Sequence, residues 1–254
     1  MIDYSKFLNN SIQEIKPSGI RKFFDIASEM DDVISLSIGE PDFQTPWHIR
    51  EEGINSLKNG KTWYSPNRGF AQLREEIANY YARRFNISYE GKTQVLVTVG
   101  GSEAIDLAFR CLVSEGDEVI IPEPSFVCYE PLTHMAGGKA VIINTKAEDE
   151  FRLKADDLEK AITDKTKLVV LPFPNNPTGA IMEKADLEAI AEVIKKHDLF
   201  VLSDEIYCEL TYGGKNHISI AAIDGMYERT VVINGFSKSY AMTGWRLGYA
   251  LGPV

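Results

Sequence analysis

The sequence predicts an α/β fold: a seven-stranded, mainly parallel sheet with helices on both faces, arranged as an α-β-α sandwich. From about residue 95, short apolar runs alternate with longer amphipathic segments, and strands separated by helices build parallel sheets. The chain has 254 residues, 44% of them hydrophobic, which is enough for a core on both sides of a sheet. The expected strands are residues 95–99, 118–121, 140–143, 168–171, 200–203, 230–233 and 247–251.

The segments around these runs have helical periodicity. Ahead of the first strand, apolar residues between Gly69 and Phe85 recur at helical spacing and are flanked by charges. The last strand follows its predecessor without a full helix, which favours an antiparallel orientation for it. The helices expected after the first strand begin at about Ser102 and at Ser125, and cover residues 155–162 and 184–197.

The first 60 residues have a different character and are expected to form an N-terminal arm and a loop segment. A helical pattern lies around Ile20, Phe23, Phe24 and Ile26, and a turn-rich stretch follows at residues 37–43. The large domain is then expected to cover residues 61–254, since no repeat or low-complexity linker divides that part of the sequence.

Composition argues against several classes of protein. Lys and Arg total 27 against 37 Asp and Glu, so the net charge of −10 disfavours nucleic acid and anionic membranes as partners. The cysteines, Cys111, Cys128 and Cys208, form no CxxC pair, so neither a disulfide framework nor a metal site is expected, and a cytoplasmic location fits best. No stretch approaches the roughly 18 apolar residues of a membrane span, and the N-terminus has no apolar leader. We therefore expect a soluble, unprocessed protein.

Polar and small residues follow three of the expected strands at the edge where ligands bind in parallel sheets. The pair Gly100 and Gly101 follows the strand at 95–99, and free N–H groups of the next helix there suit a phosphate. A rigid Pro/Asn/Gly loop follows 168–171 and carries Asn176, and Asp204 follows 200–203. Each feature alone is typical of an ordinary turn or helix cap.

The strand at 230–233 ends in a more specific segment, in which small residues surround Lys238 and Arg246. A lysine in a partly desolvated, cation-lined pocket loses its proton readily and can attack an aldehyde. An arginine supplies the bidentate charge that a phosphate needs. A lone lysine is ordinarily a solvated surface charge, but chemically suited residues at four strand ends together favour a binding site.

At these residues the sequence resembles the class I/II aminotransferases, pyridoxal-phosphate (PLP) enzymes of fold type I in the aspartate-aminotransferase-like superfamily. The resemblance covers nearly the whole chain and implies the large domain of that fold. The segment from Ser237 to Arg246 is its most specific part. The other matching segments are GEPDF at residues 39–43, YSP at 64–66, the glycine pair before Ser102, PSF at 124–126, NNPTG at 175–179 and SDEIY at 203–207.

The resemblance implies roles for the residues around the PLP ring. Lys238 would form the internal aldimine and then move the proton between substrate carbon and cofactor. Asp204 would keep the pyridine nitrogen protonated, which makes the ring an electron sink. Asn176 and Tyr207 match the residues that hydrogen-bond the 3-oxygen of PLP. Phe126 matches the aromatic residue that stacks on the ring, where many relatives have Trp or Tyr.

The phosphate and the substrate are also assigned by this resemblance. The backbone around Gly101, Ser102 and Glu103 would hold the phosphate, with Ser237 nearby and Arg246 as the cation. Ser102 brings no positive charge for a distal carboxylate, which argues against aspartate as the donor.

Two further positions concern the substrate and a partner subunit. Gly39, together with Asn176, matches substrate-contacting positions, and Tyr64 matches a tyrosine that reaches the phosphate of the neighbouring subunit in a homodimer. The family continues beyond the position of Val254 into a small domain with the arginine that binds the substrate carboxylate. We therefore expect this chain alone to transaminate poorly.

The expected activity is exchange of an amino group between an L-amino acid and a 2-oxo acid. Two other PLP-based interpretations remain open, a carbon-sulfur lyase on the same fold and a non-catalytic PLP-binding module. The second is disfavoured because no basic helix-turn-helix segment is present. A dinucleotide-binding dehydrogenase or a P-loop protein would share the fold class, but neither GxGxxG nor GxxxxGK occurs.

Overall fold

A computed structural model describes residues 2–13, 15, 19, 23, 26, 29–30, 32, 34 and 39–254. Seven strands form one sheet, which confirms the predicted number and approximate position of every strand. Each strand begins and ends within two residues of the range expected from its apolar run. The strands are β1 (Val95–Thr98), β2 (Glu118–Glu123), β3 (Lys139–Asn144), β4 (Thr166–Leu171), β5 (Phe200–Asp204), β6 (Thr230–Gly235) and β7 (Gly248–Leu251).

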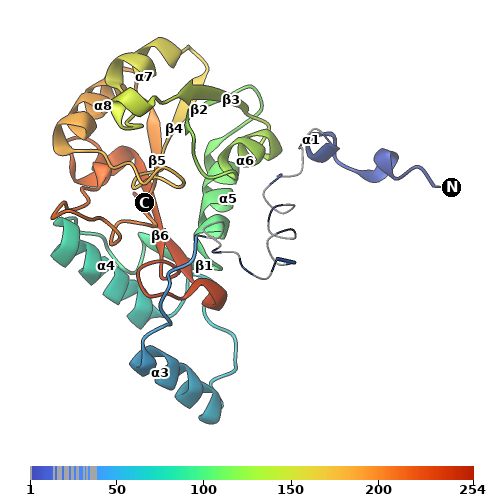
Figure 1. The fold of residues 1–254 in the computed structure, drawn as a ribbon, viewed down its shortest axis with the longest axis vertical. Helices are drawn as coiled ribbons and strands as arrows, with labels where there is room; N and C mark the ends of the chain where they lie inside the picture. The colour runs from blue at the N-terminus through green and yellow to red at the C-terminus, as the bar shows by residue number, and fades with distance from the viewer. Residues whose placement is uncertain are drawn as a thin grey trace.

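The sheet has the strand order β1-β7-β6-β5-β4-β2-β3 (Figure 1). Neighbouring strands from β3 to β6 run parallel, whereas β7 runs antiparallel to both β1 and β6. The antiparallel last strand is as predicted, because the short connection from β6 leaves no room for a crossover helix. The register pairs Asp204 of β5 with Ile233 of β6, which brings the two strand ends carrying the most reactive residues side by side.

Helices cover both faces of the sheet, so the predicted α-β-α sandwich is confirmed. One face packs against α5 (Gly101–Leu112) and α6 (Tyr129–Met135), through a core that includes Phe109, Leu202 and Ile233. The other face packs against α4 (Ala71–Phe85), α7 (Ala155–Ala161) and α8 (Lys184–Lys196). Because side chains alternate along a strand, the side chains on the two faces of β5 pack into different cores.

Local sequence explains where the larger helices start and end. The side chains of Glu183 and Asp186 form a capping box at the start of α8. Asn86 ends α4 in the left-handed conformation, with φ of 56°. The buried residues of α4 and α8 follow helical spacing, as the sequence predicts.

One helix prediction is wrong in part, and one helix was not predicted. The helix expected from Ser125 begins at Tyr129, because residues 125–128 form a loop at the end of β2 beside a cavity. The segment 1–60, expected as arm and loop, contains α3 (Trp47–Lys58), which buries none of its residues and so has no apolar stripe to reveal it. The helix expected around residues 20–26 lies largely outside the described residues.

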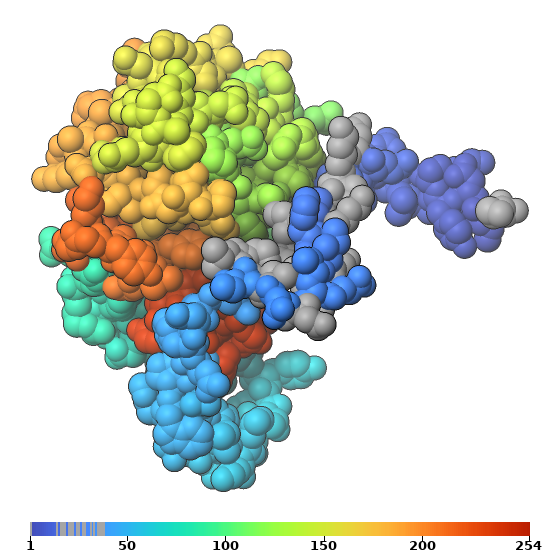
Figure 2. Space-filling model, in the orientation of Figure 1, coloured from blue at the N-terminus to red at the C-terminus, as the bar shows by residue number. Residues whose placement is uncertain are grey.

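The remaining elements are short. The 3₁₀ helix η1 (Tyr4–Phe7) and α1 (Asn10–Gln13) extend away from the sheet. Figure 2 shows α3 and the chain after it projecting from the body of the molecule. Within the described residues, no helix has the length and apolar character to cross a membrane. The other 3₁₀ helices are η2 (Ala147–Asp149), η3 (Ile220–Ala222), η4 (Tyr227–Arg229) and η5 (Thr243–Trp245).

Candidate active site

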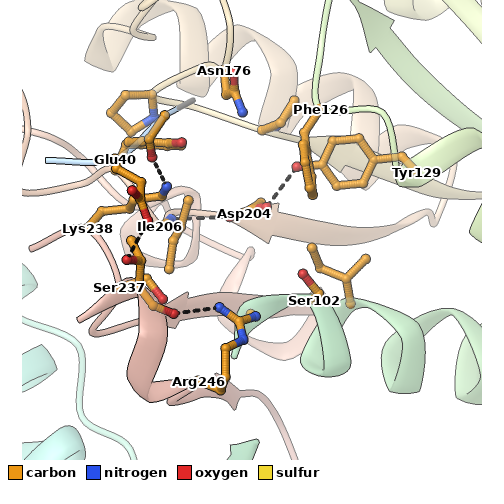
Figure 3. Close-up of a pocket in the computed structure, with 17 residues that line it drawn as sticks. Glu40, Ser102, Phe126, Tyr129, Asn176, Asp204, Ile206, Ser237, Lys238 and Arg246 are labelled. Carbon is orange, nitrogen blue, oxygen red and sulfur yellow. Dashed lines mark hydrogen bonds between the residues drawn. The ribbon is translucent and has the colours of Figure 1, made fainter. Parts of the chain in front are cut away.

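A cavity of about 370 Å³ lies where β2, β4, β5 and β6 end, a size typical of small-molecule sites. It brings together most of the residues that the sequence predicts for a site, although they come from segments as far apart in the chain as Gly39 and Arg246 (Figure 3). The predicted residues that line it are Gly39, Gly101, Ser102, Phe126, Asn176, Asp204, Tyr207, Ser237, Lys238 and Arg246.

Asp204 supplies a carboxylate that is buried at the floor of this cavity. Its Oδ1 atom accepts a hydrogen bond from the backbone N–H of Ile206 at 3.1 Å, and Oδ2 accepts one from the hydroxyl of Tyr129 at 2.7 Å. Burial raises the pKa of Asp204, and the two hydrogen bonds oppose that rise. Each oxygen keeps a free lone pair, so the carboxylate can accept a further N–H from a ligand.

Lys238 lies on the loop after β6 and its amine points into the same cavity (Figure 3). The amine donates to the backbone carbonyl of Gly39 and lies 5.4 Å from the ring centroid of Tyr207. Burial lowers the pKa of Lys238. The negative charge of Glu40 opposes this effect, whereas the positive charge of Arg246 adds to it. A lysine of this kind is more often neutral, and so more nucleophilic, than an exposed lysine.

Arg246 and the start of α5 form a cradle for an anion. The N–H groups at residues 101–102 have no partner within the helix, and Ser102 and Arg246 flank them. A Cβ atom at Gly100 would lie 2.5 Å from the guanidinium of Arg246, so glycine there lets the cation sit against the helix end. Helix dipole, free N–H groups and a guanidinium fit the requirements of a phosphate group.

The cradle depends on a close backbone approach between two strand ends. A Cβ atom at Gly248 would lie 2.4 Å from the carbonyl carbon of Gly100 and equally close to the nitrogen of Gly101. Only glycine at 248 allows β7 to pass the turn that starts α5. The packing of these glycines therefore fixes the distance between Arg246 and the N-terminus of α5.

Asn176 faces the cavity because the side chain of the preceding residue, Asn175, turns into the loop after β4. The side-chain oxygen of Asn175 accepts hydrogen bonds from the backbone and the hydroxyl of Thr178, at 3.1 and 2.8 Å. These bonds close the loop after β4 and leave Asn176 at the cavity wall. Tyr207 lies on the turn after β5, where burial and the charge of Asp204 raise the pKa of its hydroxyl.

Phe126 and Tyr129 form the aromatic side of the cavity. Their rings meet edge to face, with centroids 6.1 Å apart. The sequence did not single out Tyr129, which binds Asp204 and is one of the largest fully buried side chains. The signal available in the sequence was its position three residues after Phe126.

Residues 39–45 are tied to the loop that carries Lys238 by two side-chain contacts. Thr243 donates to Glu40 at 2.8 Å, and Thr45 donates to the carbonyl of Ala241 at 2.6 Å. Glu40 and Thr243 also line the cavity, and neither was predicted. Their contacts hold Gly39 next to Lys238.

Two predicted residues do not line the cavity. The side chain of Glu103 turns back to accept from the backbone N–H of Val99 at 2.5 Å, because a carboxylate in the first turn caps its own helix. Tyr64 is fully exposed and lies away from the cavity. Among the described residues, no group of three or more His, Cys, Asp and Glu side chains is arranged to hold a metal ion.

Several known proteins are similar to this chain in sequence and in structure. Over 246 residues, or 97% of this chain, the chain is 47% identical both to the aromatic-amino-acid aminotransferase 2 of Thermococcus litoralis and to the aspartate aminotransferase of Pyrococcus abyssi. It covers 63% of the length of each. The crystal structure of aspartate aminotransferase from Thermus thermophilus with maleate superposes with a TM-score of 0.91 at 39% identity, over 97% of this chain and 64% of that one.

A sequence family described as aminotransferase class I and II matches residues 31–254, which include every strand and every cavity residue. The cavity lies at the strand ends of the fold that this chain shares with the Thermus thermophilus structure. The chain therefore belongs to the aminotransferase class I and II family.

Proposed function

We propose that this chain is the PLP-binding part of an aminotransferase that exchanges an amino group between an L-amino acid and a 2-oxo acid. The observation that carries the proposal is the pairing, in one cavity, of a lysine whose pKa is lowered with a fully buried carboxylate. An acidic and a basic group that face one cavity and both have shifted pKa values are characteristic of catalytic sites.

The residues fit PLP in three ways. When bound, PLP supplies an electrophilic aldehyde and, through its protonated ring nitrogen, an electron sink. The cradle of Gly101, Ser102 and Arg246 suits its phosphate, with Ser237 beside it. Asp204 has a free lone pair at the cavity floor that suits a ring N–H. Phe126 offers an aromatic face, and Asn176 and Tyr207 offer side-chain donors at the cavity wall.

The chain's own groups can also handle the proton that the reaction moves. The amine of Lys238 points into the cavity, and its lowered pKa makes the neutral amine available as a general base. Asp204 holds negative charge at the cavity floor, where it favours a positive charge on a bound ring. The carbonyl of Gly39 lies at the Lys238 amine, so the substrate would enter beside this loop.

We also propose that the protein works as a homodimer in the cytoplasm. Trp63 and Tyr64 are large side chains exposed next to α3, and such surfaces favour a protein partner. A second subunit would cover them and bring Tyr64 to its neighbour's phosphate. The three cysteines are unpaired, which fits a reducing compartment. Sedimentation of the PLP-loaded protein tests the dimer.

Product analysis tests the reaction. PLP-loaded protein is mixed with a panel of L-amino acids and a 2-oxo acid, and amino transfer to the oxo acid is measured by chromatography. Transfer of the amino group supports the proposal. Release of pyruvate and ammonia from a sulfur amino acid would replace it with a carbon-sulfur lyase. Stable PLP binding without either product would indicate a non-catalytic module.

A further inference from the structure

A second buried charge cluster lies directly behind the cavity. Glu205 follows Asp204, and its side chain is fully buried on the opposite face of the sheet. Its Oε1 atom accepts hydrogen bonds from the hydroxyls of Ser203 at 2.9 Å and Ser219 at 2.6 Å. Its Oε2 atom lies 3.1 Å from Nε2 of His217, whose side chain is only 8% exposed.

Glu205 and His217 approach each other closely without forming a hydrogen bond of normal geometry. Neither Oε2 of Glu205 nor Nε2 of His217 meets hydrogen-bond geometry with any described residue, although the two atoms are close. The surroundings are otherwise apolar, with Leu171, Phe173 and Met182 beside the histidine. A buried ion pair adds little net stability compared with well-packed apolar side chains. A role in stability alone therefore does not explain it.

The other ionisable groups around the pair are neutral or already paired. Burial raises the pKa values of Tyr81, Tyr89 and Tyr249, which feel the charge of Glu205, so these tyrosines keep their protons. Burial likewise raises the pKa of the Cys208 thiol.

Glu209, which lies near His217, forms its own ion pair with Arg84 at 3.0 Å. Within the described structure, His217 is thus the one basic side chain with a nitrogen within 4 Å of the Glu205 carboxylate.

The cluster is connected to the cavity through one short piece of backbone. The N–H of Glu205 donates to the carbonyl of Ile233 at 2.8 Å, and the carbonyl of Glu205 accepts from Cys208 at 2.9 Å. This turn carries Asp204 at one end and Tyr207 at the other. Glu205 is also one of the charges that act on Asp204, where it opposes ionisation.

We propose that Glu205 and His217 form a buried ion pair that positions the Asp204–Tyr207 turn from behind and keeps Asp204 ionised by cancelling the charge of its neighbour. Both are positioning residues, since neither lines the cavity. This inference rests on the proposed cofactor role of Asp204. The histidine cation offsets a carboxylate that would otherwise repel the charge on Asp204.

The test is a ¹³C NMR titration of the Asp204 carboxyl in the 254-residue chain labelled at aspartate, measured without PLP. The signal is assigned by its loss in Asp204→Asn. The variants are Glu205→Gln, His217→Gln and the double variant. Glu209→Gln is the matched control, because it makes the same change on the same turn at a carboxylate paired with Arg84.

The two single variants are expected to shift the Asp204 titration in opposite directions. Glu205→Gln removes a repelling charge and lowers the midpoint, whereas His217→Gln leaves Glu205 uncompensated and raises it. The double variant returns close to the unsubstituted chain, and Glu209→Gln shifts the midpoint far less than either single variant. If one single variant does not fold, the other and the double variant still determine the sign.

Shifts in the same direction, or shifts no larger than in Glu209→Gln, would overturn the proposal, because a purely structural pair has no reason to give opposite signs. A parallel measurement of PLP binding by the unsubstituted chain separates this result from the proposed function. Failure to bind PLP would remove the proposed cofactor site, whereas the titration without PLP reports on the ion pair alone.

Discussion

The hydroxyl of Tyr129 donates a 2.7 Å hydrogen bond to Oδ2 of Asp204 and thereby joins the start of α6 to the end of β5. Tyr129→Phe keeps the ring and leaves a buried carboxylate short of one donor. We expect a loss of about 1–3 kcal/mol in the free energy of unfolding, measured with urea. Tyr89→Phe is the control, since the buried Tyr89 hydroxyl has no partner among the described residues. Equal losses in both variants would contradict this role of Tyr129.

Asp204 is expected to lower the free energy of unfolding of the cofactor-free protein at neutral pH. Burial raises its folded-state pKa above the unfolded value. The folded protein therefore holds this proton more tightly than the unfolded chain. The resulting contribution to the free energy of unfolding is fully present at pH values below the unfolded pKa, and it is lost as the pH rises through the folded pKa. Asp204→Asn should thus be more stable than the unsubstituted chain at pH 7, with the gain fading in acid. Urea unfolding at several pH values measures the difference. A loss of stability at pH 7 in this variant would contradict the expectation.

Glu40 is expected to set the pH at which Lys238 reacts. Its charge raises the pKa of Lys238, so Glu40→Gln should lower that pKa and move the pH profile of PLP capture to lower pH. Stopped-flow absorbance at a series of pH values measures the capture rate. Glu51→Gln, a change at an exposed residue of α3, serves as the control. A shift to higher pH would show that Glu40 does not act on the lysine in this way.

Gly248 is expected to tolerate no side chain. The added Cβ of Gly248→Ala would lie 2.4 Å from the carbonyl carbon of Gly100, and overpacking of this kind costs roughly 1–3 kcal/mol. The melting temperature should fall by roughly 2–4 °C per kcal/mol. Gly244→Ala makes the same change four positions earlier, in η5, where no atom lies within 4 Å of the new Cβ, and should melt close to the unsubstituted chain. Similar melting of the two variants would rule out the close approach.

The periodicity of the sequence was sufficient to predict the strands of the sheet but not the exposed helix α3. Apolar runs in β4 and β5 are continuous because both faces are covered, so their positions could be predicted closely. The helix α3 buries no residue, and its sequence therefore has no stripe that periodicity can detect. The start of α6 was placed too early because the loop at residues 125–128 differs from a helix only through its tertiary contacts.

The candidate site could be predicted where residue type and strand end coincide. Lys238, Asp204 and Asn176 are chemically distinctive residues at strand ends or in the loops that follow them, and all three line the cavity. Tyr129 and Glu40 act through contacts with residues far away in the sequence, Asp204 and Thr243, and only the fold reveals these contacts.

The attachment of PLP to Lys238 is the central claim and has a direct test. The chain is incubated with PLP, reduced with borohydride, digested and mapped by mass spectrometry, with Lys238→Ala treated in parallel. Our account predicts a phosphopyridoxyl label on the peptide that contains Lys238 and its absence from the variant. A folded chain that carries the label on another lysine, or carries none, would contradict the assignment.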